Sequence, residues 1–252
     1  MKDAWHSLSE FTPARIAQGR AGFSLPTEAI LDFQLAHAAA RDAVQQIWQV
    51  EQFDQSLKAS GFETIHLNTL VNNRVQYLQR PDLGRQLNQR SKDLLQSYSN
   101  RHYDMVIIVS NGLSSLAIDQ HGLNLLKSID LAFQNSQLKL APICLVPNAR
   151  VALADEIGFL LGAKSAVILV GERPGLSVAD SIGAYLTYAP KLGNTDAERN
   201  CISNIHSPDG LSYSLAAQKL AYLTSQARLK GYSGVLLKDD DVSSTYIQQN
   251  FA

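Results

Sequence analysis

The chain has 252 residues, and its 22 lysines and arginines against 23 aspartates and glutamates give a formal charge of −1. Proteins dedicated to nucleic-acid binding need an excess of basic residues to displace counterions, so this balance excludes that class. A hydrophobic content of 45% is ordinary for a globular protein, and the length suffices for one large domain or a domain with a sizeable appendage.

The number of cysteines and the length of the apolar runs indicate the cellular compartment of the protein. Cys144 and Cys201 are too few for a disulfide framework or a four-cysteine zinc site. Runs such as Met105–Val109 are far shorter than the roughly 20 apolar residues of a membrane-spanning helix, and Met1–Glu10 lacks the apolar centre of a signal peptide. We therefore expect a cytoplasmic protein with reduced thiols and no membrane partner.

The first hundred residues have mainly helical patterns. Ser24–Thr27 is typical of a helix start, because Ser and Thr cap helices and Pro suits the first turn. Apolar residues in Ile30–Leu57 recur at spacings of three and four, which predicts a long helix that ends near Gly61. A weaker helical pattern covers about residues 72–98 and is interrupted by a proline.

Beyond Tyr103, short apolar runs alternate with helical stretches. The expected strands are Met105–Val109, Pro142–Val146, Ala166–Val170, Ala184–Tyr188 and Val235–Leu237, and the expected helices are Leu113–Phe133, Val151–Leu161 and Leu211–Leu229. Fully apolar strands that alternate with helices predict an α/β fold, in which helices cover both faces of a parallel sheet. We expect the helical N-terminal region to pack against this part of the chain.

In a parallel sheet, ligands bind outside the carboxyl ends of the strands. Three polar or glycine-bearing turns fall there, namely Ser110–Gly112, Pro147–Arg150 and Gly171–Gly175. In the third turn, Glu172 and Arg173 directly follow an apolar strand. Two interpretations stay open: a surface ion pair in a structural turn, or a carboxylate that accepts hydrogen bonds at a ligand crevice.

Motifs of a self-contained enzyme or metal site are absent from the sequence. Asp119–Gly122 is similar to Asp-x-His-x-x-Gly, through which some cobalamin proteins bind cobalt by histidine, but Asn124 stands in place of the glycine. We therefore expect His121 to be a surface residue at a helix end. No nucleophile elbow, Walker loop or zinc-binding His pair is present, and Asp239–Asp241 is more typical of a solvated turn than of a cation site. We predict no catalytic and no metal-binding residue, which suggests a subunit that binds a cofactor while the chemistry takes place elsewhere.

Several sequence blocks, in a fixed order over nearly the whole chain, resemble the small (light) subunit of ethanolamine ammonia-lyase. The blocks are Phe11–Gly22, Leu25–Thr27, Asp32–Ala38, Ala40–Val44, Ser110–Ser114, Arg150–Gly158, Gly171–Leu176 and Arg199–Ile205. The resemblance implies a mainly helical N-terminal region, residues 1–100, that makes subunit contacts. It also implies a Rossmann-like cobalamin-binding domain, residues 101–252.

The resemblance further implies an adenosylcobalamin-dependent lyase that converts ethanolamine to acetaldehyde and ammonia by radical chemistry. In this family the large subunit holds the substrate and supplies the catalytic side chains, so the implied assembly is a hetero-oligomer. Some members carry a longer amphipathic N-terminal extension associated with encapsulation in a bacterial microcompartment. Ten residues precede Phe11 here, so the resemblance supports activity more directly than it supports encapsulation.

The cofactor contacts of the family fall on Val151, Glu172 and Cys201, and Arg150 is a further candidate. Val151 has no polar side-chain atom, so we expect its backbone N–H to donate to a corrin amide. We expect Glu172 to be ionised and to accept hydrogen bonds from corrin amides, and Cys201 to make close contact without thiolate chemistry. Asn111 departs from the pattern, because many members have Asp there.

Two other interpretations remain. A stand-alone α/β enzyme that binds a nucleotide or a sugar phosphate would need its own acid–base residues, and the sequence shows no such set. A scaffold that has lost its cofactor contacts is the third interpretation.

Overall fold

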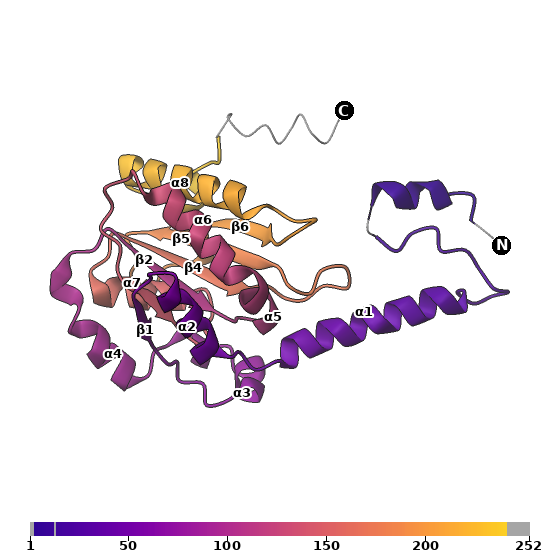
Figure 1. Ribbon diagram of the computed structural model, residues 1–252, viewed down its shortest axis with the longest axis horizontal. Helices are drawn as coiled ribbons and strands as arrows, with labels where there is room; N and C mark the ends of the chain where they lie inside the picture. The colour runs from indigo at the N-terminus through magenta and orange to yellow at the C-terminus, as the bar shows by residue number, and fades with distance from the viewer. Residues whose placement is uncertain (1–2, 13, 241–252) are drawn as a thin grey trace.

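A computed structural model describes residues 3–12 and 14–240, and Figure 1 shows its arrangement. These residues form one six-stranded sheet with the order β1-β3-β2-β4-β5-β6. The strands are β1 (Thr64–His66), β2 (Met105–Ser110), β3 (Ile143–Leu145), β4 (Ser165–Gly171), β5 (Ile182–Tyr188) and β6 (Arg199–Ile205). Strands β1, β3, β2 and β4 are parallel, whereas β5 and β6 are each antiparallel to the preceding strand.

Helices cover both faces of this sheet (Figure 1). The α-helices are α1 (Thr27–Gln45), α2 (Val50–Ala59), α3 (Arg74–Gln79), α4 (Gln89–Gln96), α5 (Ser115–Ala117), α6 (Leu123–Phe133), α7 (Leu153–Leu161) and α8 (Tyr213–Lys230). The apolar cluster on one face includes residues of α2, α6 and α8, and the cluster on the other face includes residues of α4 and α7. The prediction of helices on both faces is therefore confirmed.

Strand β2 shows why the central strands have continuous apolar sequences. Met105, Ile107 and Val109 belong to one apolar cluster, whereas Val106 and Ile108 belong to the other. Successive side chains of a strand point to opposite faces, and here both faces are covered. The five positions from Met105 to Val109 therefore all carry apolar residues.

The prediction of a parallel sheet is right for four strands and wrong for the last two. Residues 172–181 are all that connect β4 to β5, and they contain no helix. A parallel crossover needs a dozen or more residues, usually with a helix, whereas an antiparallel pair needs only a short loop. The length of this connection therefore sets the antiparallel pairing, and the sheet is mixed.

Two strands lie where none was expected. The strand β1 lies between the two helical patterns expected in the first hundred residues, and its Ile65 pairs with Cys144 of β3. The strand β6 has polar or charged residues at four of its seven positions, RNCISNI, and pairs with β5 at the edge of the sheet. The functional division between residues 1–100 and 101–252 stays a prediction, and β1 joins the first part to the sheet of the second.

Two other expectations about elements were wrong. The long helix expected over Ile30–Leu57 is two helices, because the backbone of Gln46 is extended with ψ of 130° and ends α1. The strand expected at Val235–Leu237 is instead a 3-10 turn over Gly234–Leu236. The carbonyl groups of Gly234 and Leu237 accept hydrogen bonds from the Asn200 side chain, so they are satisfied without strand pairing.

The N-terminal arm, which we define as residues 14–45, leads away from the sheet (Figure 1). Ala43 is the one buried residue of α1, although the helix has 19 residues. Phe23 is fully exposed, and Leu31 and Leu35 are also exposed. The arm therefore presents apolar side chains that its own chain does not cover.

No helix in the described ranges combines the length and the apolar character needed to cross a bilayer.

Candidate functional site

Two adjoining cavities lie beside the carboxyl ends of the parallel strands. The first has a volume of about 620 Å³ and the second about 440 Å³, and both are lined by Arg150, Val151 and Tyr185. Cys201 lines the first cavity, and Glu172 lines the second. The structure thus brings Glu172 and Cys201 together with Arg150 and Val151, from which they are 21 or more positions away in the sequence.

The segment between β3 and α7 presents unused backbone donors. Helix α7 begins at Leu153, so Val151 lies in the turn just before the helix and not in its first turn. The N–H groups of Val151 and Ala152 donate to no acceptor within the described residues. Free N–H groups at a helix start carry partial positive charge, so they can donate to a ligand that enters the cavities.

The turn before α7 is held by side chains of the first polar turn. The Asn111 side-chain oxygen accepts a hydrogen bond from the Asn148 N–H at 2.7 Å, and Ser110 Oγ accepts one from the Ala149 N–H at 3.0 Å. The Tyr77 hydroxyl donates to the Ala149 carbonyl at 3.1 Å. These bonds join α3, β2 and the 147–150 turn, and they fix the backbone donors in place.

Glu172 is a hydrogen-bond acceptor and not half of a surface ion pair. Its carboxylate accepts hydrogen bonds from Ser181 Oγ at 2.6 Å, Ser203 Oγ at 2.5 Å and the Asn204 N–H at 3.2 Å. No ion pair between Glu172 and Arg173 is present in the described part of the chain. A carboxylate accepts about four hydrogen bonds, so Glu172 keeps one acceptor position for a ligand.

Cys201 lies on β6 opposite Tyr185 of β5. Partial removal of the thiol from water raises the pKa of Cys201, and burial likewise raises the pKa of Tyr185. Both groups are therefore neutral near pH 7. Cys144, in contrast, is buried in β3 as expected, and burial raises the pKa of its thiol to about 12.

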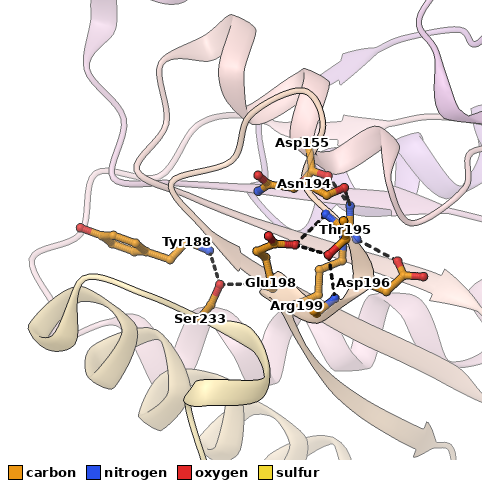
Figure 2. A network of polar contacts seen from close by, with 9 residues as sticks. Asp155, Tyr188, Asn194, Thr195, Asp196, Glu198, Arg199 and Ser233 are labelled. Carbon is orange, nitrogen blue, oxygen red and sulfur yellow. Dashed lines mark hydrogen bonds and ion pairs between the residues drawn. The ribbon is translucent and has the colours of Figure 1, made fainter.

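A polar network that the sequence did not reveal holds the wall of the first cavity (Figure 2). The Arg199 guanidinium donates to Asp155 of α7, to Asp196 at 2.8 Å and to the Asn194 carbonyl at 3.3 Å. Asn194, Asp196 and Arg199 all line this cavity. Arg199 belongs to a block that resembles the light-chain family, but nothing in its spacing pointed to Asp155, because the two are 44 positions apart.

The network continues from Glu198 to Ser233 and Tyr188 (Figure 2). Ser233 Oγ donates to the Glu198 carbonyl at 2.5 Å and accepts a hydrogen bond from the Tyr188 N–H at 2.8 Å. Thr195 and Glu198 form a capping box at the 3-10 turn η5 (Asp196–Glu198). The 189–198 loop is therefore anchored at both ends.

His121 is not a surface residue, contrary to the prediction. Its ring is buried in a single π-helical turn, Ile118–Gly122, because Tyr213 of α8 lies against it. One ring nitrogen lies 2.7 Å from the Tyr213 hydroxyl, and the other lies 3.0 Å from the Asp180 carboxylate. Asp180 precedes Ser181, which bonds Glu172, so His121 anchors the loop that carries Glu172.

Among the described residues, no group of three His, Cys, Asp or Glu side chains is placed to hold a metal ion. Asp241, the last member of the acidic triplet, lies outside the described residues.

Comparison with known proteins decides the family. Residues 2–238 match the family model described as ethanolamine ammonia-lyase light chain. The chain belongs to this family. The resemblance seen in the sequence blocks is thereby confirmed.

Curated light-chain relatives agree over nearly the full length. The ethanolamine ammonia-lyase small subunit of Pseudomonas putida is 48% identical over 252 residues, which cover 99% of this chain and 92% of the relative. The small subunit of Ralstonia nicotianae is 49% identical over 94% of this chain and 89% of the relative. That of Pseudomonas syringae is 50% identical over 94% of this chain and 83% of the relative. This light chain is therefore a subunit of a lyase.

Proposed function

We propose that this small subunit binds adenosylcobalamin together with a large subunit, in the enzyme that converts ethanolamine to acetaldehyde and ammonia. The observation that carries the proposal is the convergence of Val151, Glu172 and Cys201 on two adjoining cavities. In this proposal residues 101–252 hold the cofactor in a Rossmann-like arrangement, and residues 1–100 serve subunit contacts. The complex works in the cytoplasm, and microcompartment residence is a separate prediction.

The donors and acceptors of the two cavities fit a corrin. The corrin periphery carries amide side chains, and each amide group has both an acceptor oxygen and donor N–H groups. The free N–H groups of Val151 and Ala152 suit the amide oxygens, and the remaining acceptor position of Glu172 suits an amide N–H. The neutral thiol of Cys201 adds a small contact surface. When bound, the cofactor supplies the radical by homolysis of its cobalt–carbon bond.

In this proposal the light chain binds and orients the cofactor, and we assign it no catalytic residue. The substrate lies on the large subunit, which supplies the acid–base groups. Exposed apolar residues of the N-terminal arm, such as Phe23, Leu31 and Leu35, support a protein partner. Solvent-exposed apolar surface of this kind is stabilised by burial against another chain.

Co-expression of the chain with an ethanolamine ammonia-lyase large subunit tests the proposal. The purified complex should show a corrin absorption spectrum after incubation with adenosylcobalamin and gel filtration, and it should release acetaldehyde from ethanolamine. A complex that forms without retaining the corrin contradicts the cofactor role. Tight binding of a nucleotide or a sugar phosphate by the chain alone would instead support the stand-alone enzyme.

A further inference from the structure

Two guanidinium groups lie over the Tyr77 ring without a carboxylate partner. The central guanidinium carbon of Arg74 is 5.0 Å from the ring centroid, and that of Arg150 is 4.2 Å from it. Neither side chain forms an ion pair in the described part of the chain. Arg74 is buried, and it donates to the carbonyl groups of Val44 and Gly112 and to the Asn148 side chain. A buried cation without a counter-charge is costly, so this positive charge points to a bound anion.

Arg150 lines both cavities, so its positive charge is available to a ligand in either of them. Its Nη2 donates to the Tyr77 carbonyl at 3.1 Å, whereas its Nη1 and Nε donate to no acceptor within the described residues. Gly84 lies under the side chain, where an added Cβ would come within 3.1 Å of Arg150 Cγ. The aliphatic part of the side chain thus packs against Gly84, the guanidinium lies over Tyr77, and the guanidinium has donor capacity left for a ligand.

The neighbours of Arg150 reinforce the positive charge. The free N–H groups of Val151 and Ala152 follow it at the start of α7, where the helix dipole favours an anion. Arg85 lines the first cavity and also lacks an ion-pair partner in the described ranges. The carboxylates that line the cavities are those of Glu172 and Asp196, and neither is within 4.0 Å of Arg150. Asp196 pairs with Arg199, so it leaves Arg150 uncompensated.

We propose that Arg150, together with Arg85, binds a phosphate group, and that this group is the phosphodiester of the cobalamin nucleotide tail. The inference rests on the proposed function. The corrin amides are neutral, and the phosphodiester is the anionic group of the cofactor. A guanidinium fork matches two phosphate oxygens at once, which an ammonium does not.

Paired cofactors that differ in this group test the inference. Adenosylcobinamide lacks the phosphate and the nucleotide, whereas adenosylcobalamin has both. Equilibrium dialysis of each against the complex with the large subunit gives two affinities for wild type, Arg150→Gln and Arg150→Lys. Arg90→Gln is the matched control, because it removes the same charge from α4 at an exposed position that lines neither cavity.

Arg150→Gln should weaken adenosylcobalamin binding at least tenfold, about 1.4 kcal/mol, and change adenosylcobinamide binding less than twofold. Arg150→Lys keeps the positive charge, so it should lose less adenosylcobalamin affinity than Arg150→Gln does. Arg90→Gln should match wild type for both ligands. Retained adenosylcobinamide binding also shows that the variant folds and assembles. Equal losses for the two cofactors, or no loss for either, would overturn the inference.

Competition with inorganic phosphate distinguishes a site for the phosphodiester of the cofactor from a site for free phosphate. Under the inference it competes with adenosylcobalamin and leaves adenosylcobinamide binding unchanged. If phosphate raises the melting temperature of the cofactor-free wild-type complex but not of Arg150→Gln, while the ratio of cofactor affinities stays the same, the site takes free phosphate and the assignment to the cofactor is wrong.

If Arg150→Gln prevents assembly with the large subunit, the arginine pairs with a partner carboxylate and the assignment to the cofactor is also wrong. Wild-type complex that binds neither cofactor contradicts the proposed function itself.

Discussion

Arg199 on the edge strand β6 donates to the Asp155 carboxylate on α7, and both side chains are almost completely buried, with exposed fractions of 3% and 4%. The pair joins an edge strand to a helix that begins at the cavity. Burial of one charge without the other is strongly unfavourable, so the pair ties the cavity wall to the core.

Arg199→Met should therefore lower the free energy of unfolding by about 3–5 kcal/mol, because it leaves the Asp155 carboxylate buried and unpaired. Asp196→Asn is the control, since Asp196 is 98% exposed and its bond to the same arginine should contribute at most about 1 kcal/mol. Urea unfolding followed by circular dichroism measures both. An Arg199→Met variant as stable as Asp196→Asn would show that the buried pair does not hold the wall.

Asn111 fits its site as an amide and not as a carboxylate. Its Nδ2 donates to Ser115 Oγ at 3.1 Å, and Ser115 in turn donates to the Gln46 carbonyl at 2.7 Å. A carboxylate cannot donate to Ser115; it would instead accept the hydrogen bond of the Ser115 hydroxyl and leave the Gln46 carbonyl without this donor. Asn111→Asp should cost about 1–3 kcal/mol at pH 7.

The loss in Asn111→Asp should shrink as the pH falls, because a protonated carboxyl donates as the amide does. Thermal unfolding at several pH values measures this, and Asn124→Asp, an exposed change of the same chemistry, serves as the control. A loss that is constant with pH would contradict the donor argument.

Glu172→Gln should weaken adenosylcobalamin binding to the complex about tenfold, near 1.4 kcal/mol. The amide has one acceptor oxygen, and the three bonds from Ser181, Ser203 and Asn204 already exceed its capacity. Val151→Ala is the contrast, because its contact is through the backbone N–H, and its affinity should change less than tenfold. Equilibrium dialysis gives both values, and an unchanged affinity for Glu172→Gln would remove the carboxylate from the binding site.

His121 and its two partners should respond as a coupled unit. His121→Phe leaves the Asp180 carboxylate and the Tyr213 hydroxyl without a shared partner, and we expect a loss of about 1–3 kcal/mol. Tyr213→Phe removes one bond and should cost about 1 kcal/mol. The double variant should lose less than the sum of the two, because both changes break the same bond. Additive losses in urea unfolding would show that the contacts are independent.

Asp104 should give a measurable pH dependence of stability. A hydrogen bond from the Lys139 N–H, together with Lys164 and Arg228, lowers the pKa of Asp104 to about 2. A lowered pKa in the folded state stabilises the fold at pH values above the unfolded pKa, and this contribution is lost as the pH falls through about 4 toward 2. Asp104→Asn should therefore cost about 1 kcal/mol at pH 7, after allowance for solvent screening, and nothing near pH 2. Urea unfolding at several pH values measures the difference in free energy of unfolding between wild type and Asp104→Asn. A difference that grows as the pH falls would contradict a lowered pKa of Asp104.

The central strands and the place of the site could be predicted from the sequence. The strands β2, β3 and β4 are buried on both faces, so their sequences are apolar apart from Ser110 at the end of β2 and Ser165 at the start of β4. Because ligands bind outside the carboxyl ends of parallel strands, the turns after β3 and β4 then placed Arg150 and Glu172 at the same edge of the sheet.

What remained hidden depends on contacts between distant segments. The strand β6 lies at the edge of the sheet and lines a cavity, so its sequence RNCISNI is largely polar. Such a sequence lacks the regular alternation of apolar and polar residues that would distinguish a strand from a loop. The burial of His121 depends on Tyr213, which is 92 positions away. The counter-charge deficit at Arg74 and Arg150 is visible only once the carboxylates have been placed in space.

The exposed arm makes the stability of its helix a property of the assembly. Helix α1 buries one residue against its own chain, and an isolated helix of this length is marginal in water even with favourable residues. A binding partner that covers the helix adds free energy that grows with the logarithm of the partner concentration. The helicity of residues 27–45 would therefore report how much of the chain is assembled, independently of whether the two cavities, which no residue of α1 lines, hold a ligand.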